Sequence, residues 1–215
     1  MMTTAYDLAG NQLIKAYRAA DTSGENALSS ANSLLQHRPV SQRLLSLFTE
    51  EEKTKDIRYE LWVNNKRVAK KTFFCGMRTA EFKLMEAECY YHSGEKVKAL
   101  RSINDLRAHR IANYVDLTEN TLPALSEKEI IITDAEGNAL TPLMGIILSE
   151  RRKELFLEGD RFFELKRNGS PEFWTAYNGQ KYTTKKYMYT FPIPAHDILL
   201  VDGLQQNEGY TEISY

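Results

Sequence analysis

Two consecutive helical patterns between Arg78 and Arg110 most constrain what this 215-residue chain can fold into. Apolar residues recur at helical spacing on both sides of Ser93-Gly94. In the second pattern they are Val97, Leu100, Ile103 and Leu106. Glycine ends the first helix because it adopts the backbone conformation that closes a helix at no steric cost. The pattern therefore predicts two antiparallel helices, 78–93 and 95–110, joined by a short turn.

This helical pair, about 33 residues long, resembles one tetratricopeptide-like repeat. Such a pair cannot bury its own apolar faces and needs stacked neighbours, and a solenoid needs roughly three repeats. The sequence contains no second good copy, so we expect the segment 142–167 to pack beside the pair. The first helix has a further apolar stripe that includes Cys89, and we expect this residue to be an inert core thiol.

The remaining chain predicts a mainly α fold with one small β-hairpin and long irregular loops. Thr141-Pro142 marks the start of the helix 142–167, in which Gly159 introduces a bend. Residues 57–63 and 67–74 are typical of two strands joined by a tight turn at Asn64-Asn65. The segments 111–140 and 170–187 read as loops.

Composition excludes several classes of protein. The chain has 28 Lys and Arg against 29 Asp and Glu, so its net charge of -1 argues against a nucleic-acid partner. It lacks an apolar run long enough for a transmembrane helix. No nucleotide-binding or hydrolase motif is present, and the four histidines lie far apart in sequence. We expect neither a cofactor nor a metal site.

Three carboxylates in the segment 150–161 have the residue type that glycosidases use. Glu150, Glu154 and Glu158 are four residues apart and therefore share one helix face, whereas a catalytic pair must lie across a substrate. Arginines interleave with them. We interpret the set as a structural ion-pair network, and its members are Glu150, Arg151, Arg152, Glu154, Glu158 and Arg161.

Four segments together carry a family resemblance. The longest is the run 150–169, which begins Glu-Arg-Arg-Lys-Glu-Leu-Phe-Leu-Glu-Gly-Asp-Arg. The others are Asp56-Ile57-Arg58, the helical pair 78–110, and Phe191-Pro192-Ile193-Pro194 followed by Asn207-Glu208-Gly209-Tyr210. In this order and spacing they resemble the C-terminal portion of the SusD/RagB family.

The resemblance implies a non-catalytic protein of polysaccharide utilisation. Members are lipid-anchored, surface-exposed outer-membrane proteins of Bacteroidetes that bind nutrients, mostly glycans. They cap a TonB-dependent SusC-like transporter, and a tetratricopeptide-like scaffold presents their ligand loops. Because this sequence shows no secretion signal or lipidated cysteine, we expect 1–40 to be an N-terminal helix and linker left from a longer protein, and 41–215 to be the SusD/RagB-like C-terminal domain.

Two segments combine the flat rings and polar groups that sugar binding needs. The predicted hairpin offers Tyr59, Trp62 and Asn64, and the loop after the signature helix offers Trp174, Tyr177, Asn178 and Gln180. Three alternatives stay open from the sequence. In the first, Trp62 or Trp174 packs on the helical core. In the second, the helical pair is a protein-interaction scaffold. In the third, the chain is a glycosidase that uses Glu154 or Glu158.

Overall fold

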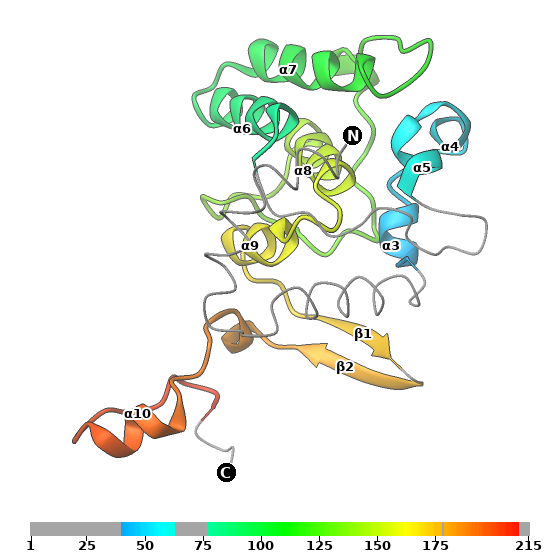
Figure 1. The fold of residues 1–215 in the computed structure, drawn as a ribbon. Helices are drawn as coiled ribbons and strands as arrows, with labels where there is room; N and C mark the ends of the chain where they lie inside the picture. Colours follow the sequence, from blue (N-terminus) through cyan, green and yellow to red (C-terminus); the bar gives the residue numbers. More distant parts are fainter. Residues whose placement is uncertain (1–39, 63–76, 178, 211–215) are drawn as a thin grey trace. The chain divides into compact units, whose positions relative to one another are not determined.

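The computed structural model describes residues 40–62, 77–177 and 179–210, and Figure 1 shows their fold. These residues are mainly helical and contain one two-stranded antiparallel sheet. They form two compact units. The first comprises 40–62, 77–129 and 140–161, and the second comprises 130–139, 162–177 and 179–210. No helix among the described residues has the length and apolarity needed to cross a membrane.

The predicted helical pair forms the first unit's scaffold. Helix α6 (Thr79–His92) packs against α7 (Lys96–Ala108), and the two lie side by side in Figure 1. Gly94 links them with a positive φ of 78°. Helix α8 (Pro142–Glu154) packs on both, so it supplies the neighbour that the pair requires. The prediction of a mainly α fold with these helices together is confirmed.

Only one face of α6 is buried among the described residues. Ala80, Leu84 and Ala87 line this face and pack toward the neighbouring helices. The further apolar stripe faces outward, because Phe82 is 53% exposed and Cys89 is exposed. The expectation that Cys89 is a core thiol was therefore wrong. Apolar spacing alone did not tell which of the two stripes the neighbours cover.

Helix α8 begins as its sequence predicts and ends earlier. The hydroxyl of Thr141 accepts a hydrogen bond from the Met144 amide at 3.2 Å, and Pro142 occupies the first turn, where its missing N–H costs nothing. Leu157 and Gly159 then take positive φ values of 61° and 79°. These residues break the predicted helix 142–167 completely, and α9 (Asp160–Arg167) starts after them.

Among the described residues, three short helices precede the scaffold: α3 (Gln42–Leu45), α4 (Glu52–Lys55) and α5 (Ile57–Trp62). The prediction of a strand over 57–63 was wrong. The Asp56 side chain accepts a hydrogen bond from the Arg58 amide at 2.9 Å and thereby starts a helical turn. The Ile57 amide donates to the carbonyl of Arg110 at 2.9 Å, so a tertiary contact holds the turn in place. The second predicted strand, 67–74, lies outside the described residues.

The second unit contains the sheet, at a position where the sequence predicted a loop. Strand β1 (Phe173–Tyr177) pairs antiparallel with β2 (Gln180–Thr184). Gly179 lies in the connection with a φ of 75°, as two-residue hairpin turns require. The short helices η2 (Lys186–Tyr189) and α10 (Ala195–Leu200) follow. The segment 111–140 is mostly irregular, as predicted, apart from η1 (Glu119–Thr121).

The closing segments of the chain hold each other through side-chain amides. Gln206 donates to the carbonyl of Ile193 at 2.8 Å and accepts from its amide at 2.7 Å. Asn207 donates to the carbonyl of Phe191 at 2.7 Å. Gly209 has a φ of +88°, and a Cβ there would lie 2.4 Å from the Tyr187 ring. The glycine is thus required both by its conformation and by the ring beside it.

We expect Gly209→Ala to destabilise the protein more than Gly203→Ala. Both glycines have positive φ, at +88° and +81°, so each alanine costs about 1–2 kcal/mol of backbone strain. A Cβ at Gly203 meets no atom within 4 Å, whereas at Gly209 it overlaps Tyr187. Urea unfolding of the two variants measures the difference. Equal losses of unfolding free energy would contradict the packing argument.

Candidate functional site

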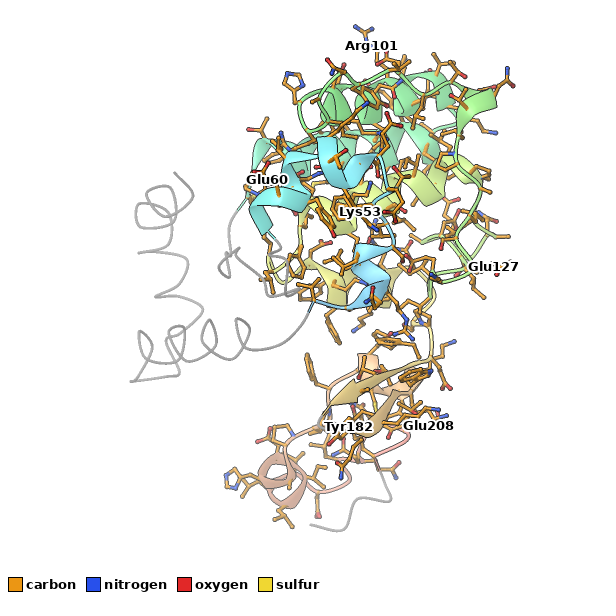
Figure 2. The ribbon with its side chains drawn as sticks, turned by 90° about the vertical axis from the view of Figure 1, so that its right-hand side faces the viewer. Lys53, Glu60, Arg101, Glu127, Tyr182 and Glu208 are labelled. Atoms are coloured by element: carbon orange, nitrogen blue, oxygen red, sulfur yellow. The ribbon has the colours of Figure 1, made fainter. Side chains whose placement is uncertain are left out.

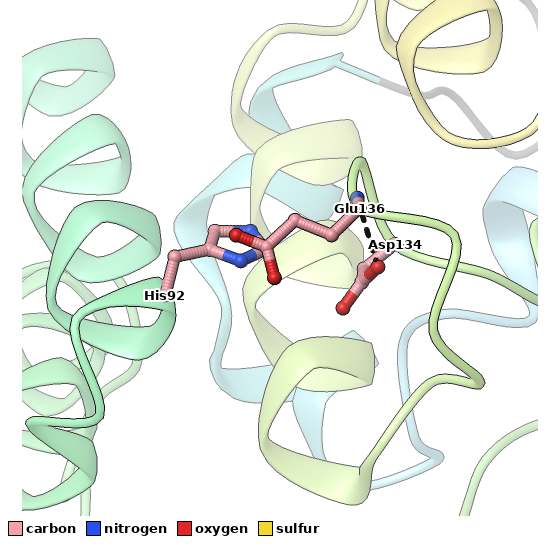
Figure 3. A group of neighbouring side chains, drawn as sticks. All are labelled: His92, Asp134 and Glu136. Carbon is pink, nitrogen blue, oxygen red and sulfur yellow. Dashed lines mark hydrogen bonds between the residues drawn. The ribbon is translucent and has the colours of Figure 1, made fainter.

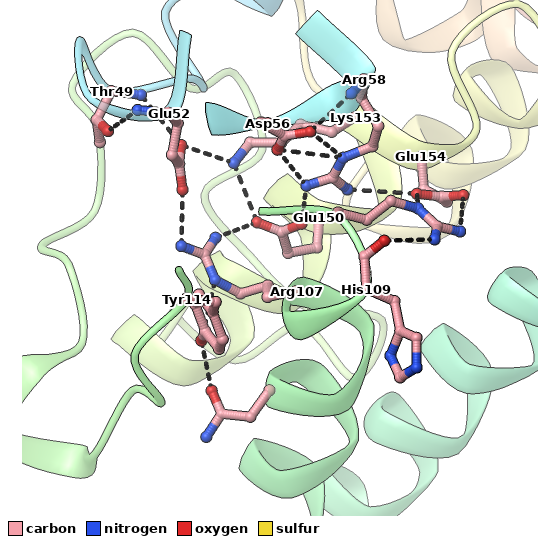
Figure 4. Close-up of polar contacts among 12 residues, drawn as sticks. Thr49, Glu52, Asp56, Arg58, Arg107, His109, Tyr114, Glu150, Lys153 and Glu154 are labelled. Carbon is pink, nitrogen blue, oxygen red and sulfur yellow. Dashed lines mark hydrogen bonds and ion pairs between the residues drawn. The ribbon is translucent and has the colours of Figure 1, made fainter. Parts of the chain in front are cut away.

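A network of buried charges occupies the interior of the first unit (Figure 4). It joins α4, α5, α7 and α8, which come from distant parts of the sequence. Its buried acids are Glu52, Asp56, Glu150 and Glu154, and its buried bases are Arg58, Arg107 and Lys153. Buried charges are tolerated only where they are paired and hydrogen-bonded, so the contacts of each group decide what the network does.

Glu150 is the most enclosed member, with a fully buried side chain. Its carboxylate accepts hydrogen bonds from Arg58 Nη2 at 2.7 Å, from Lys153 Nζ at 3.0 Å, and from Arg107 Nη1. Burial alone would raise the pKa of Glu150. The charges of Arg58, Lys153 and Arg107 outweigh burial and hold the pKa far below its ordinary value. Glu150 is therefore an anion at any physiological pH.

Glu154 makes a second junction, one helical turn further along α8. It accepts hydrogen bonds from Arg110 at 2.9 and 3.0 Å and from Arg78 Nη1 at 2.8 Å. Burial raises its pKa, but these donors and the charge of Arg58 lower it to about 2. Arg78 also binds Glu158 at 2.9 Å. The start of α6 is thus tied to the end of α8.

Glu52 and Asp56 bring the short helices into the network. Glu52 pairs with Arg107 at 2.6 Å and with Lys153 at 3.1 Å. Its carboxylate also accepts a hydrogen bond from the Thr49 amide, and the Thr49 hydroxyl accepts one from the Glu52 amide, which is the reciprocal pattern of a capping box. Asp56 holds Arg58 at 2.7 Å. The charges that cap and orient α4 and α5 are the same ones that fix α7 and α8.

All six residues that the sequence assigned to a network make ion pairs, but mostly with other parts of the chain. Outside the two junctions, Arg151 binds Asp160 at 2.5 Å, and Glu129 binds Arg152 at 3.3 Å and Arg161 at 3.1 Å. Sequence reasoning missed their distant partners, which are Arg58, Arg78, Glu81, Arg107, Arg110 and Glu129. The sequence did carry a signal for Arg58, because this residue belongs to the Asp56-Ile57-Arg58 segment of the family resemblance. That the network has a purely structural role stays a prediction.

The exposed face of the hairpin is the second candidate site. Trp174 pairs with Thr183 and Ala176 pairs with Lys181, so these four residues share one face of the sheet. Trp174 is 49% exposed, and Lys181 Nζ lies 5.5 Å from the centroid of its ring. Tyr182, labelled in Figure 2, occupies the opposite face and is 48% exposed. The hairpin therefore presents an aromatic ring on each face.

The sugar-binding candidates fall in different places. Trp174 is exposed on β1, and Tyr177 pairs with Gln180 at the end of that strand. Tyr59 is half-buried on α5 and its ring packs edge-on against Phe48, with 5.3 Å between the centroids. Trp62 is the last residue of α5. Asn64 and Asn178 lie outside the described residues.

The grouping of Tyr59 with Trp62 and Asn64 depended on a hairpin at 57–74. Because residues 57–62 are helical, that grouping loses its basis. The hairpin 173–184 keeps its own, since strand pairing brings side chains together there.

An acidic turn in the second unit has a conformational role. Asp134 is 2% exposed, and its Oδ1 accepts hydrogen bonds from the amides of Glu136 at 3.0 Å and Asn138 at 2.8 Å. Figure 3 shows the Asp134 and Glu136 side chains with the first of these bonds. Gly137 completes the turn with a φ of 85°. The Asp134 carboxylate therefore caps its own loop.

The described residues thus form a helical scaffold locked by internal ion pairs and a hairpin that exposes aromatic rings. The family model of the SusD family matches residues 63–210, which is more than half of the chain, and the chain belongs to this family. No curated protein matches the chain. Membership implies glycan binding for nutrient uptake by generally non-catalytic proteins that are typically associated with the cell surface.

We expect Glu150→Gln to destabilise the fold by about 3–5 kcal/mol, because it removes the charge that three buried cations share. Glu50→Gln is the matched control. Glu50 binds Lys53 at 2.5 Å, but its side chain is 90% exposed, so its loss costs at most about 1 kcal/mol. Chemical denaturation of both variants tests this. Comparable losses would show that burial does not govern the value of these pairs.

Acid should unfold the protein through the same carboxylates. The folded-state pKa values of Glu52, Glu150 and Glu154 lie below their unfolded value, so the unfolded state binds more protons in this range. The stabilisation is complete above about pH 5. It decreases as the pH falls toward the pKa of Glu154, about 2. Urea midpoints measured from pH 7 to pH 3 should fall steeply below about pH 5, and a midpoint that stays constant would contradict this assignment.

Proposed function

We propose that this chain binds an extracellular glycan without cleaving it and passes it to a SusC-like TonB-dependent transporter in the outer membrane. Membership of the SusD family supports glycan binding for nutrient uptake. The main support for the location of the binding site is the exposed indole of Trp174 on one face of the hairpin. Flat aromatic rings pack against the C–H face of sugars, and they are most available where the protein leaves them uncovered.

The residues beside Trp174 suit a polar, ring-shaped ligand. Thr183 lies directly across the strand pair on the same face, and Lys181 lies diagonally across it. A hydroxyl can donate or accept, and an ammonium can donate three hydrogen bonds, so sugar hydroxyls find partners around the stacked ring. A strand pair also fixes these groups at defined spacing, which favours recognition of a sugar.

The carboxylates of α8 argue for binding without catalysis. A glycosidase needs a general acid with a raised pKa next to its substrate. Glu154 has a lowered pKa of about 2 and a side chain only 1% exposed. Glu150 is fully buried and bound by three cations. Neither can donate a proton to a glycosidic oxygen in solution.

Trp174→Ala should weaken glycan binding about ten- to a hundredfold, by analogy with other aromatic stacking platforms. The melting temperature should stay within a few degrees, because the ring is half exposed. Phe163→Ala is the control, since it removes a 67% exposed ring elsewhere on the second unit. Affinity electrophoresis on a polysaccharide panel measures binding, and a reducing-sugar assay should detect no product.

Three results would overturn the proposal. Equal binding by wild type and Trp174→Ala would remove the hairpin as the site. Release of sugar by purified protein, abolished in Glu154→Gln, would make the chain an enzyme. An early melting transition of Trp174→Ala would place the ring in the core, where truncation costs about 3–5 kcal/mol of stability.

A further inference from the structure

One positive charge stands on the hairpin beside the proposed stacking ring. Residues 173–184 contain a single charged side chain, Lys181. Strand pairing sets it on the same face as Trp174, diagonally across the ladder, and its direct partner there is the small Ala176. Its Nζ lies 5.5 Å from the Trp174 centroid. Both side chains are exposed.

The residues that flank the hairpin add further positive charge. Lys185 and Lys186 follow β2, and Glu172 precedes β1. Glu172 is already engaged, because its carboxylate binds Lys185 Nζ at 3.2 Å and accepts a hydrogen bond from the Lys186 amide at 3.2 Å. The segment 172–186 thus has three lysines and one glutamate.

Lys98 in the first unit offers an instructive comparison. Its Nζ also lies 5.5 Å from an aromatic centroid, that of Tyr90. Lys98, however, has an anionic partner, Glu95, at 3.1 Å. Within the part of the chain that the structure describes, no carboxylate lies within 4.0 Å of Lys181 Nζ. Each lysine thus lies over an aromatic ring, but among the described residues only Lys98 also has a carboxylate partner.

We propose that the face formed by Trp174 and Lys181 selects anionic glycans, meaning polysaccharides with carboxylate or sulfate groups. This inference rests on the proposed function and narrows its ligand class. The indole stacks on the sugar ring, and the ammonium beside it meets a negative group at the edge of that ring. An exposed cation–π contact is weak, so an incoming anion readily draws the ammonium to itself.

Two matched pairs of polysaccharides test the preference with the full chain. Polygalacturonate is compared with fully methyl-esterified polygalacturonate, and dextran sulfate is compared with dextran. Each pair keeps the sugar backbone and removes the charge. We expect tighter binding to the charged member of at least one pair, with an affinity that falls as salt rises. The two pairs also distinguish carboxylate from sulfate as the preferred anion.

Lys181→Gln should weaken binding to the preferred charged polysaccharide about fivefold and weaken binding to its uncharged counterpart less, because the glutamine amide still donates to sugar hydroxyls but carries no charge. Lys98→Gln should change neither. Because Lys181 is exposed, its variant should keep the wild-type melting temperature. Equal binding of charged and uncharged polysaccharides, or an unchanged affinity of Lys181→Gln, overturns the preference.

The outcomes distinguish failure of the anionic preference from failure of the proposed glycan binding. If Trp174→Ala weakens binding to an uncharged glycan and Lys181→Gln affects none, the chain is a glycan binder without anionic selectivity. If Trp174→Ala binds every polysaccharide as wild type does, or if none binds, the hairpin site itself is wrong and the inference falls with it.

Discussion

The buried carboxylate of Glu150 is the constraint on which the first unit depends. An unpaired charge in a protein interior costs several kcal/mol, which is a large part of a domain's stability, so Glu150 is tolerated there together with its cations. Arg58 comes from α5, Arg107 from α7 and Lys153 from α8. Three helices must therefore meet at one point, and a packing that displaces any of them leaves a charge without its partner. Apolar contacts are not directional in this way.

The network also shows where the folded unit extends along the chain. The family match covers residues 63–210, yet Glu52 and Arg58 precede it and neutralise charges within it. Glu150 and Lys153 would lose buried partners without this segment. The ion pairs therefore indicate that the unit begins before residue 63, and they explain why the Asp-x-Arg segment belongs with the helices that follow it.

The sequence predicted an element correctly where the interactions that determine it are between residues close together in the chain. The helices α6, α7 and α8 follow from local spacing, and the caps at Gly94 and Thr141 are decided by neighbouring residues. The hairpin at 173–184 had a local signal too, since Asn178-Gly179 is a strong turn pair, but the aromatic residues around it concealed the alternation.

The strand predicted over 57–63 was wrong because interactions distant in sequence determine this segment. Arg58 is 1% exposed, and apart from the neighbouring Asp56 its charged partners, Glu150 and Glu154, lie far away in sequence. No local pattern could reveal that its carbon stem points into the core. Spacing within one helix likewise showed that Glu150 and Glu154 share a face, but not which arginines they meet. Charge thus has two roles among the described residues: each buried charge of the network is paired and fixes the packing, whereas on the hairpin Lys181 is exposed beside the Trp174 ring. A matched charge has little capacity left for a ligand, which is why we propose recognition at the hairpin, where strand pairing sets the geometry.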